Sequence, residues 1–438
     1  MQYKKLWYNS SPDVKLLWLS VFIRLFSYGL TNQILTLFLK EIGASEENIG
    51  AFMSLTLAGD VILSFLLTWY AEWLGRRRTV IYGSIMMVLS GIIFAYSENY
   101  KVLLFFAIVG VISPSSDEVG PFKSIEESMM AHLTAQHERP EVYGVHAMCG
   151  ILGGCFGAIT CGTILDGLRK LQLVQTDLQG YKVVFMLYTG LAVLKLACML
   201  ALSDASEQSQ DMAKEVGARV TSDEESEQRP LLASKKQTSA LSHSTVVILC
   251  KLLVIFMVDS FGSGFMTSSW IVYYYVNVFH MSSLALGFLF FVCRLVMASS
   301  AIPSTMLTRK FGPVRATLMT QIPSALFFII VPFVEPHLGW SVLFLNLYNF
   351  TTAMDVTPRQ ILLTNLVTPK DLTRVMGIVN IGKTFARCIG PTFTGILANN
   401  GILWLCFVIS GGLVTLSDIL LAILFYGIDS EILSVINL

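Results

Sequence analysis

Charge is scarce in this chain of 438 residues: only 14% of them are Asp, Glu, Lys or Arg, whereas 54% are hydrophobic. Average soluble domains carry roughly a quarter charged residues, so the composition excludes an ordinary soluble protein. The formal net charge is zero, and we expect no nucleic-acid partner. Apolar runs of about 20 residues, the length that crosses a bilayer core as a helix, recur along the chain. We therefore expect an all-α membrane protein.

Motifs of common enzymes are also missing. The sequence contains no GxxxxGK[ST] loop for nucleotide phosphates, no HExxH zinc motif and no GxSxG nucleophile turn. Its eight cysteines form no CxxC pair and fall within or at the ends of apolar runs. We interpret them as small packing residues and expect no disulfide, metal, cofactor or enzymatic activity. We also expect no cleavable signal peptide, because the first apolar run is long and leads into another.

Twelve apolar spans follow one another along the chain. They cover residues 14–39, 49–69, 79–97, 102–122, 142–165, 183–202, 246–279, 284–307, 316–334, 340–363, 375–397 and 402–425. The seventh is longer than one bilayer crossing, so we expect an interfacial turn within it. The polar, acidic segment 203–244 is typical of a disordered cytoplasmic linker. It divides the chain into a six-helix bundle over 1–202 and a second bundle over 245–438.

Lysine and arginine gather in alternate loops. Five such loops lie on one side of the predicted membrane: 4–15, 75–78, 136–141, 308–315 and 368–374. Because short loops rich in Lys and Arg stay in the cytoplasm, we expect both termini to be cytoplasmic. The loop with Arg169, Lys170 and Lys182 departs from this rule.

The two halves repeat each other at a nearly constant spacing. The segment 132–144 matches 365–377 at an offset of 233, as Gly157 matches Gly390. Gly75 matches Gly312 at an offset of 237, and Gly29 matches Gly264 at 235, as does Arg24 with Asp259. A parallel duplication of six helices is the architecture of one large class of transporters.

The chain resembles the major facilitator superfamily over nearly its full length. Besides the duplication, the resemblance rests on the loop TWYAEWLGRRR (68–78), which is similar to the superfamily pattern Gly-x-x-x-Asp-(Arg/Lys)-x-Gly-(Arg/Lys)-(Arg/Lys). The matching positions are Gly75, Arg76 and Arg77, with Glu72 in place of the aspartate and Thr68 in place of the first glycine. The stretch GPFKSIEES (120–128) is similar to uncharacterised fungal and bacterial members. The resemblance implies twelve helices in two six-helix halves and a substrate site between them.

Ionisable residues lie within the spans, where each costs about 2.5–3.5 kcal/mol on insertion scales and should face a cavity or a partner. We expect a cavity for substrate and protons lined by Arg24, Asn32, Gln33, Asp60, Glu118, His146, Asp259, Trp270, Arg294, Asp355, Lys383 and Arg387. Arg24 and Asp259 are predicted to form an ion pair, and Glu118 or Asp355 to take up a proton. Static salt bridges that only orient the helices are the alternative. Lys195 and Asp418 are expected to reach toward the cytoplasmic ends of their spans.

The loop between the second and third spans suggests a gate. In the resembled superfamily, arginines of this loop pair with acids at the cytoplasmic ends of neighbouring helices. The resemblance therefore implies a cytoplasmic gate formed by Glu72, Gly75, Arg76 and Arg77 with Glu126 and Glu127. A solvated, charged helix end is the alternative.

The linker carries a candidate sorting signal. EQRPLL (227–232) fits an acidic dileucine pattern through Glu227, Leu231 and Leu232. Such motifs bind sorting adaptors, so we expect a vacuolar or lysosomal membrane, with the plasma membrane as the alternative.

The sequence thus predicts a secondary active transporter that works by alternating access as a monomer. Lys383 and Arg387, one helical turn apart, favour an anionic or zwitterionic small solute, and the buried acids favour coupling to protons. An uncoupled facilitator is one alternative, which would not respond to a pH gradient. A transporter-like nutrient sensor that signals through the linker is another, although the chain has no added cytoplasmic domain.

Overall fold

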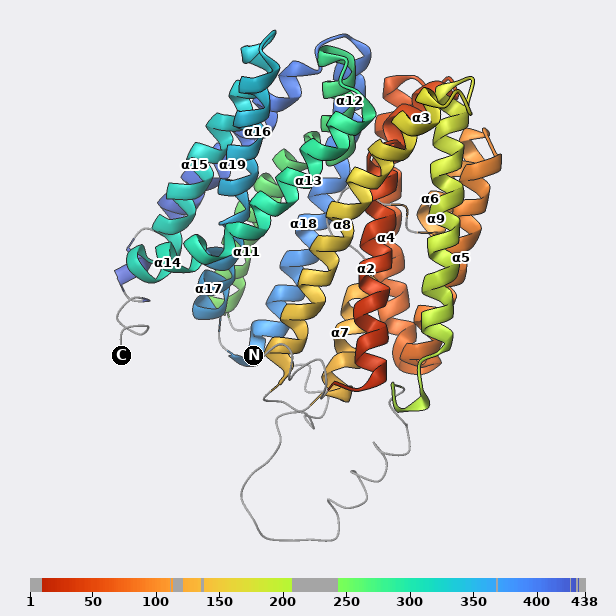
Figure 1. Cartoon of the computed structure of the whole chain (residues 1–438). Coiled ribbons are helices and arrows are strands. Elements are labelled where there is room, and N and C mark those ends of the chain that lie inside the picture. Colours follow the sequence, from red (N-terminus) through yellow and green to blue (C-terminus); the bar gives the residue numbers. More distant parts are fainter. Residues whose placement is uncertain are drawn as a thin grey trace.

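The computed structural model describes residues 10–110, 112, 121–134, 138–206, 243–367, 369–425, 427–430 and 432. Within these residues the chain is a bundle of helices that stand side by side (Figure 1). The predicted all-α fold is confirmed. Glu118 and the sorting motif 227–232 lie outside the described residues, and so does the side chain of Glu72.

The bundle consists of two halves. The N-half comprises α2 (Pro12–Asn32), α3 (Leu35–Glu41), α4 (Glu46–Leu74), α5 (Arg76–Tyr96), α6 (Tyr100–Val109), α7 (Pro121–Leu133), α8 (Arg139–Lys170) and α9 (Asp177–Leu200). The C-half comprises α11 (His243–Phe265), α12 (Ser268–Phe279), α13 (Ser283–Ser299), α14 (Ala301–Phe311), α15 (Pro313–Ile330), α16 (Leu338–Ala353), α17 (Val356–Leu366), α18 (Pro369–Asn399) and α19 (Trp404–Leu424).

The first and seventh spans break at equivalent places. The seventh changes from α11 to α12 after Phe265, which confirms the turn expected from its length. The first, expected as one helix, likewise changes from α2 to α3 after Asn32. The short helices α3 and α12 contact each other at one end of the bundle, and α7 and α17 lie toward the other end (Figure 1).

Two tight turns reflect the internal repeat. Gly75, between α4 and α5, has φ 95°, and Gly312, between α14 and α15, has φ 86°. Backbone with positive φ favours glycine because a Cβ would clash there. Both turns therefore need the glycine that the repeat places at this point of each half.

The fourth span extends further than the sequence predicted. It was expected to end at residue 122, but α7 continues as a helix to Leu133. The charged residues of α7 have the composition of a solvated helix end. Glu126 is nevertheless completely buried inside the N-half. Hydropathy cannot distinguish a polar helix that is covered by its neighbours from a helix that has left the membrane.

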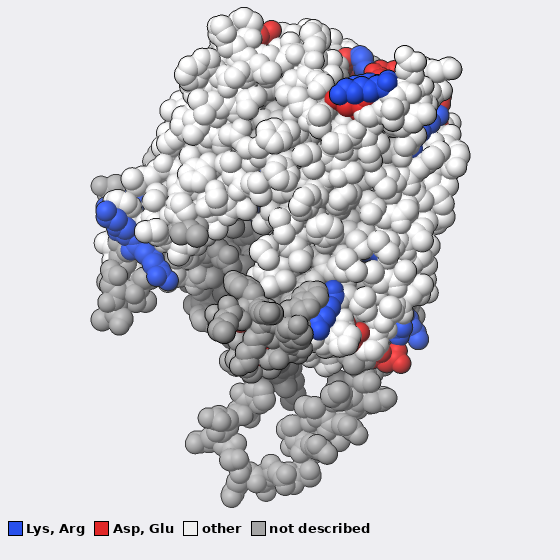
Figure 2. All heavy atoms as spheres, in the orientation of Figure 1, with Lys and Arg blue, Asp and Glu red and all other residues white. Residues whose placement is uncertain are grey.

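The apolar surface is that of a multi-pass membrane protein. Nine stretches of the described residues are helical, long and apolar enough to cross a bilayer. The spans of α6 with α7, of α16 with α17, and of α18 are not among them, because breaks and polar residues interrupt them. Figure 2 shows a broad uncharged band across the visible face, with charged side chains toward its two ends. Lipid contact requires such a band.

Glycines allow the long helices to pack closely. Gly153 and Gly157 of α8 lie against the backbone of α2 at Phe22 and Phe26, where a Cβ would not fit. Small residues at helix contacts are the usual solution in membranes, where backbones must approach to gain dispersion energy. Between the halves, α4 contacts α18 and α8 contacts α13.

Candidate functional site

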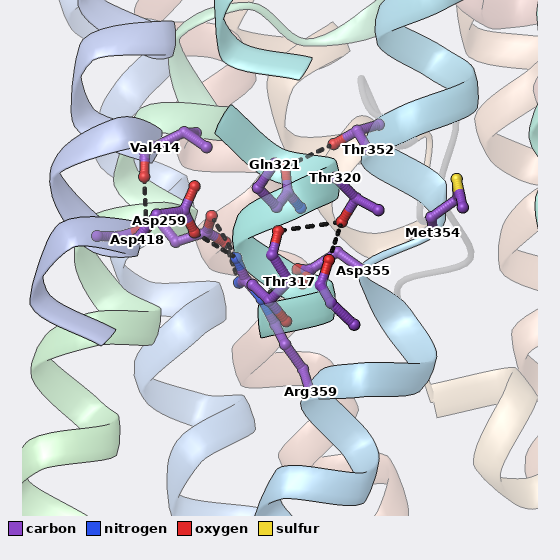
Figure 3. A network of polar contacts seen from close by, with 12 residues as sticks. Asp259, Thr317, Thr320, Gln321, Thr352, Met354, Asp355, Arg359, Val414 and Asp418 are labelled. Atoms are coloured by element: carbon purple, nitrogen blue, oxygen red, sulfur yellow. Dashed lines mark hydrogen bonds and ion pairs between the residues drawn. The ribbon is translucent and has the colours of Figure 1, made fainter. Parts of the chain in front are cut away.

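One arginine and three acids form a network inside the C-half (Figure 3). Arg359 binds Asp259 with both terminal nitrogens: Nη1 lies 2.6 Å from Oδ2 and Nη2 lies 3.0 Å from Oδ1. Asp355, one helical turn before Arg359, forms a second ion pair with it. Asp418 of α19 lies 3.9 Å from Nη2. A guanidinium suits this task because its planar fork can bind several carboxylates.

The acids of this network are not all satisfied. Asp355 is only 5% exposed and Asp418 only 1%. Within the described residues, Oδ1 of Asp355 and both carboxylate oxygens of Asp418 lack a hydrogen-bond partner. The uncharged side chains of Thr317 and Gln321 lie beside Asp355 (Figure 3). One guanidinium thus faces three carboxylates, of which Asp355 and Asp418 are buried and Asp259 is 15% exposed.

The network forms part of the wall of a cavity of about 430 Å³. Its charged lining residues are Asp259, Asp355, Arg359, Lys383 and Arg387. Four of these were predicted from the sequence as cavity residues, and the structure brings those four together. All described residues that line this cavity belong to the C-half, whereas the family resemblance implied a site between the halves.

A second charged cluster lies inside the N-half. Nη2 of Arg24 is 2.6 Å from Oε2 of Glu126, and Nε2 of His146 is 3.4 Å from the same oxygen. Ser20 donates a hydrogen bond of 3.2 Å to Oε1. The Glu126 side chain is 0% exposed and that of Arg24 is 2% exposed, so both charges depend on this pairing.

The predicted ion pair between Arg24 and Asp259 is therefore wrong. Arg24 pairs with Glu126 of its own half, and Asp259 pairs with Arg359 of the other. The reason is that α2 packs against α7 and α8 in its own half, so that the side chain of Arg24 finds a carboxylate there. Equivalence by repeat shows that two residues have the same place, not that they meet.

Lys195 and Asp418 also depart from expectation. Both were predicted to reach toward the helix ends, but the structure buries them, with exposures of 0% and 1%. Nζ of Lys195 lies 4.3 Å from the ring centroid of Phe122 and 3.3 Å from Oγ of Ser84. Asp418 thus lies in the network of Arg359, and Lys195 shares the ring of Phe122 with Arg24, whose Cζ lies 5.6 Å from its centroid.

The two clusters occupy equivalent positions with opposite charge. Arg24 corresponds to Asp259 at an offset of 235, and Glu126 corresponds to Arg359 at 233. In both halves, the two residues form the ion pair of 2.6 Å. Arg359 was not among the predicted site residues and Glu126 was assigned to the gate, although the offset of 233 already connects them.

Other predicted cavity residues lie at the contact between the halves. Arg294 of α13 lies against Gly154 of α8, where a Cβ would be 3.4 Å from its Cζ. Asp60 of α4 is buried, and neither carboxylate oxygen has a hydrogen-bond partner among the described residues. The structure places neither of them in the wall of the C-half cavity.

Three further predicted residues lie near α3 and α12. Ser269 of α12 donates a hydrogen bond of 3.4 Å to Oδ1 of Asn32. Gln33 lines a second cavity of about 310 Å³ between the halves. Trp270 is 0% exposed, and its ring packs edge-on against Tyr273. The hydrogen bond between Ser269 and Asn32 therefore helps to hold the halves together at this end.

The loop arginines do not bind the acids that were expected. Arg77 forms an ion pair of 2.5 Å with Asp204, shortly after α9. It also donates a hydrogen bond of 3.1 Å to the carbonyl of Leu200, the last residue of α9. Arg76 donates 3.5 Å to the carbonyl of Ser128. Glu126, the expected partner, is buried against Arg24, so the predicted latch to Glu126 is not formed in this conformation. The backbone carbonyl of Glu127 accepts a hydrogen bond from the hydroxyl of Tyr143.

Hydrogen bonds close the molecule at the α3/α12 end. Tyr273 of α12 donates a hydrogen bond of 2.8 Å to Glu46 of α4. Thr36 of α3 donates a hydrogen bond of 2.9 Å to the carbonyl of Ser269. Ser54 of α4 and Thr392 of α18 lie 2.7 Å apart. At the other end, the ion pairs among described residues, such as that of Arg77, stay within one half.

Comparison with known proteins gives one consistent result. A model of the Major Facilitator Superfamily matches residues 17–354. The uncharacterised membrane protein YJR124C of Saccharomyces cerevisiae is 58% identical over 437 residues, which are 98% of this chain and 97% of that protein. The solved structure of the nucleoside transporter NupG has a TM-score of 0.70 at 14% identity, covering 95% of this chain and 100% of its own. A D-xylose-proton symporter has 0.69 at 14% identity, covering 93% and 96%.

Proposed function

Because this chain belongs to the major facilitator superfamily and has the fold of its secondary transporters, we propose that it carries a small polar solute across its membrane by alternating access, coupled to protons. The solved structures with this fold are transporters rather than enzymes. Their identities are too low to transfer a substrate. The proposal therefore rests on the chemistry of this chain's own cavity.

The observation that carries the proposal is that three carboxylates, two of them buried, lie around the one guanidinium of Arg359. Asp259, Asp355 and Asp418 share this one guanidinium. A buried charge without a partner is unfavourable by several kcal/mol, so a proton on Asp355 or Asp418 stabilises the network. The cavity next to Asp355 gives a solute access to the same network. Solute and proton can therefore influence each other's binding.

The contacts between the halves support alternating access. The hydrogen bonds from Tyr273 to Glu46 and from Thr36 to Ser269 close the α3/α12 end. We propose that this is the outward side, and that the α7/α17 end, with its loops rich in Lys and Arg, faces the cytoplasm. The conformation is then one in which the cavity communicates with the cytoplasm.

Transport assays with reconstituted protein test the proposal. The full-length chain is placed in liposomes that contain the pH-sensitive dye pyranine, and amino acids, short peptides, nucleosides and sugars are added outside one at a time. We expect one class of solute to change the internal pH, and Asp355→Asn to abolish that response. Radiolabelled exchange without any pH change would identify an uncoupled facilitator. No movement of any solute would instead favour a sensor.

We further propose the vacuolar or lysosomal membrane as its location, on the strength of the motif EQRPLL (227–232). Replacing Leu231 and Leu232 together by alanine should move a fluorescently tagged protein to the cell surface. Replacing Leu241, outside the motif, by alanine is the control and should leave the location unchanged. An unaltered location of the double variant would contradict the sorting role.

A further inference from the structure

Two charges of opposite sign on the cavity wall have unused binding capacity. Lys383 of α18 is half-buried, and its Nζ lies 5.6 Å from the ring centroid of Phe256. Neither a hydrogen bond nor an ion pair of Lys383 is formed with any described residue. On the same wall, Oδ1 of Asp355 has no hydrogen-bond partner among the described residues, although the residue is only 5% exposed.

We infer that this cavity binds a zwitterion, with its carboxylate at Lys383 and its ammonium group at Asp355. The inference rests on the proposed transport function and names the class of solute. A sugar or nucleoside offers no charge to either residue, and a simple anion would satisfy only Lys383. An α-amino acid or a short peptide supplies both groups, and charge-assisted hydrogen bonds of this kind are among the strongest available to a polar ligand.

The rest of the wall suits a solute with an apolar side chain. The rings of Phe256, Phe328 and Tyr348 line the cavity, and Ser263, Ser324 and Ser410 add hydroxyl groups. Phe328 and Tyr348 stack with their ring centroids 4.1 Å apart, which makes one continuous aromatic surface. The volume of about 430 Å³ is in the range of cavities that hold small ligands. It admits an aromatic amino acid as well as a dipeptide.

The network also divides the two tasks between different acids. Asp355 lines the cavity, whereas Asp418 does not. Asp418 lies behind Arg359, at 3.9 Å from Nη2, where a solute of this size does not reach it. We therefore assign the ammonium group of the solute to Asp355 and the coupled proton to Asp418. Both can then be bound at the same time on two sides of one guanidinium.

Three related compounds test the zwitterion directly. Binding to the purified full-length protein is measured by titration calorimetry with L-phenylalanine, with phenethylamine, which lacks the carboxylate, and with 3-phenylpropionate, which lacks the amine. We expect L-phenylalanine to bind at least about tenfold more tightly than either analogue, because each analogue lacks one of the two charge-assisted contacts, with Lys383 or with Asp355. L-Alanyl-L-alanine distinguishes a dipeptide site from an amino-acid site. Equal binding of 3-phenylpropionate and L-phenylalanine would overturn the inference.

Variants connect each group of the solute to its residue. Lys383→Met should abolish the preference for L-phenylalanine over phenethylamine, and Asp355→Asn should abolish the preference over 3-phenylpropionate. Lys383→Arg, which keeps the charge, should retain part of the first preference, and Lys310→Met, an exposed lysine of the same half, should retain all of it. Unchanged preferences in both charge-removing variants would contradict the assignment.

The inference of a zwitterionic solute and the proposal of transport can be disproved separately. If uridine or xylose changes the internal pH of the liposomes and none of the zwitterions binds, the inference is wrong but the transport proposal stands. If L-phenylalanine binds as expected but no solute moves, the site is correct and the transport proposal is wrong.

Discussion

At the scale of single residues, the N-half depends on a fully buried ion pair. Arg24 and Glu126 lie 2.6 Å apart, and their side chains are 2% and 0% exposed. Removing one partner of such a pair leaves the other charge buried without compensation, which typically destabilises a protein by about 3–5 kcal/mol. Replacing both partners by apolar residues avoids this penalty.

We therefore expect Glu126→Gln to lower the free energy of unfolding by about 3 kcal/mol or more. The double variant Arg24→Met with Glu126→Leu should be more stable than either single variant. Thermal unfolding of the purified variants in detergent measures their relative stabilities. Glu98→Gln is the matched control, since Glu98 pairs with Lys182 at 2.5 Å but is 55% exposed, and exposed pairs contribute only about 0–1 kcal/mol. Equal effects of Glu126→Gln and Glu98→Gln would contradict the role of burial.

The sequence identified many charged residues of the site but not their partners. Asp259, Asp355, Lys383 and Arg387 were predictable because a charge within a membrane span requires a cavity or a partner. The partner of Asp259 was not, because it depends on how α11 and α17 are rotated and packed. Arg359 is four residues after Asp355, and this helical spacing was the available signal for including it.

At the scale of helices, close crossings keep the α3/α12 end shut. Gly287 of α13 crosses α8 so closely that a Cβ would overlap the backbone carbonyl of Ala158. Because α13 and α8 belong to different halves, a larger side chain at position 287 acts as a wedge between them. The effect falls on the closed conformation, since the crossing does not persist once the halves separate at this end.

We expect Gly287→Leu to shift the population toward the conformation open at the α3/α12 end. Spin labels are attached at Glu41→Cys and His280→Cys in a chain without native cysteines. The distance between them, measured by double electron–electron resonance, should increase. Gly190→Leu is the control, because a Cβ at that glycine of α9 meets no atom within 4 Å. An unchanged distance distribution in Gly287→Leu would show that this crossing does not limit the opening.

The boundaries of the helices were predictable only where hydropathy reports them. The turn in the seventh span followed from its excess length, whereas the matching break after Asn32 lies in a run of ordinary length. The helix α7 was missed beyond residue 122 because Glu126 and Glu127 have the composition of a solvated end. The burial of Glu126 depends on neighbouring helices, which a local pattern does not contain.

At the scale of the whole molecule, the repeat conserves positions but exchanges charges. Arg24 and Glu126 in the N-half correspond to Asp259 and Arg359 in the C-half. The N-half cluster therefore places one acid, Glu126, near Arg24 and His146, whereas the C-half places three acids near one arginine. The halves are alike in fold and different in electrostatics.

This difference explains why we assign solute and proton to the same half. The fold itself could be predicted, since the bilayer fixes the length of the helices and the duplication fixes their order. The location of the site could not, because the resemblance implied a cavity shared by both halves. The group of three carboxylates around Arg359 becomes visible only when α11, α17 and α19 are placed together.

The most direct test of this account is the internal pH of pyranine-loaded liposomes during uptake of a transported solute, compared between the unmodified protein and Asp418→Asn. We predict that the unmodified protein acidifies the interior as the solute enters. Asp418→Asn should still exchange radiolabelled solute across the membrane but should no longer move protons with it. Acidification by Asp418→Asn at the rate of the unmodified protein would contradict the proton role of this carboxylate. Solute uptake by the unmodified protein without any pH change would contradict proton coupling altogether.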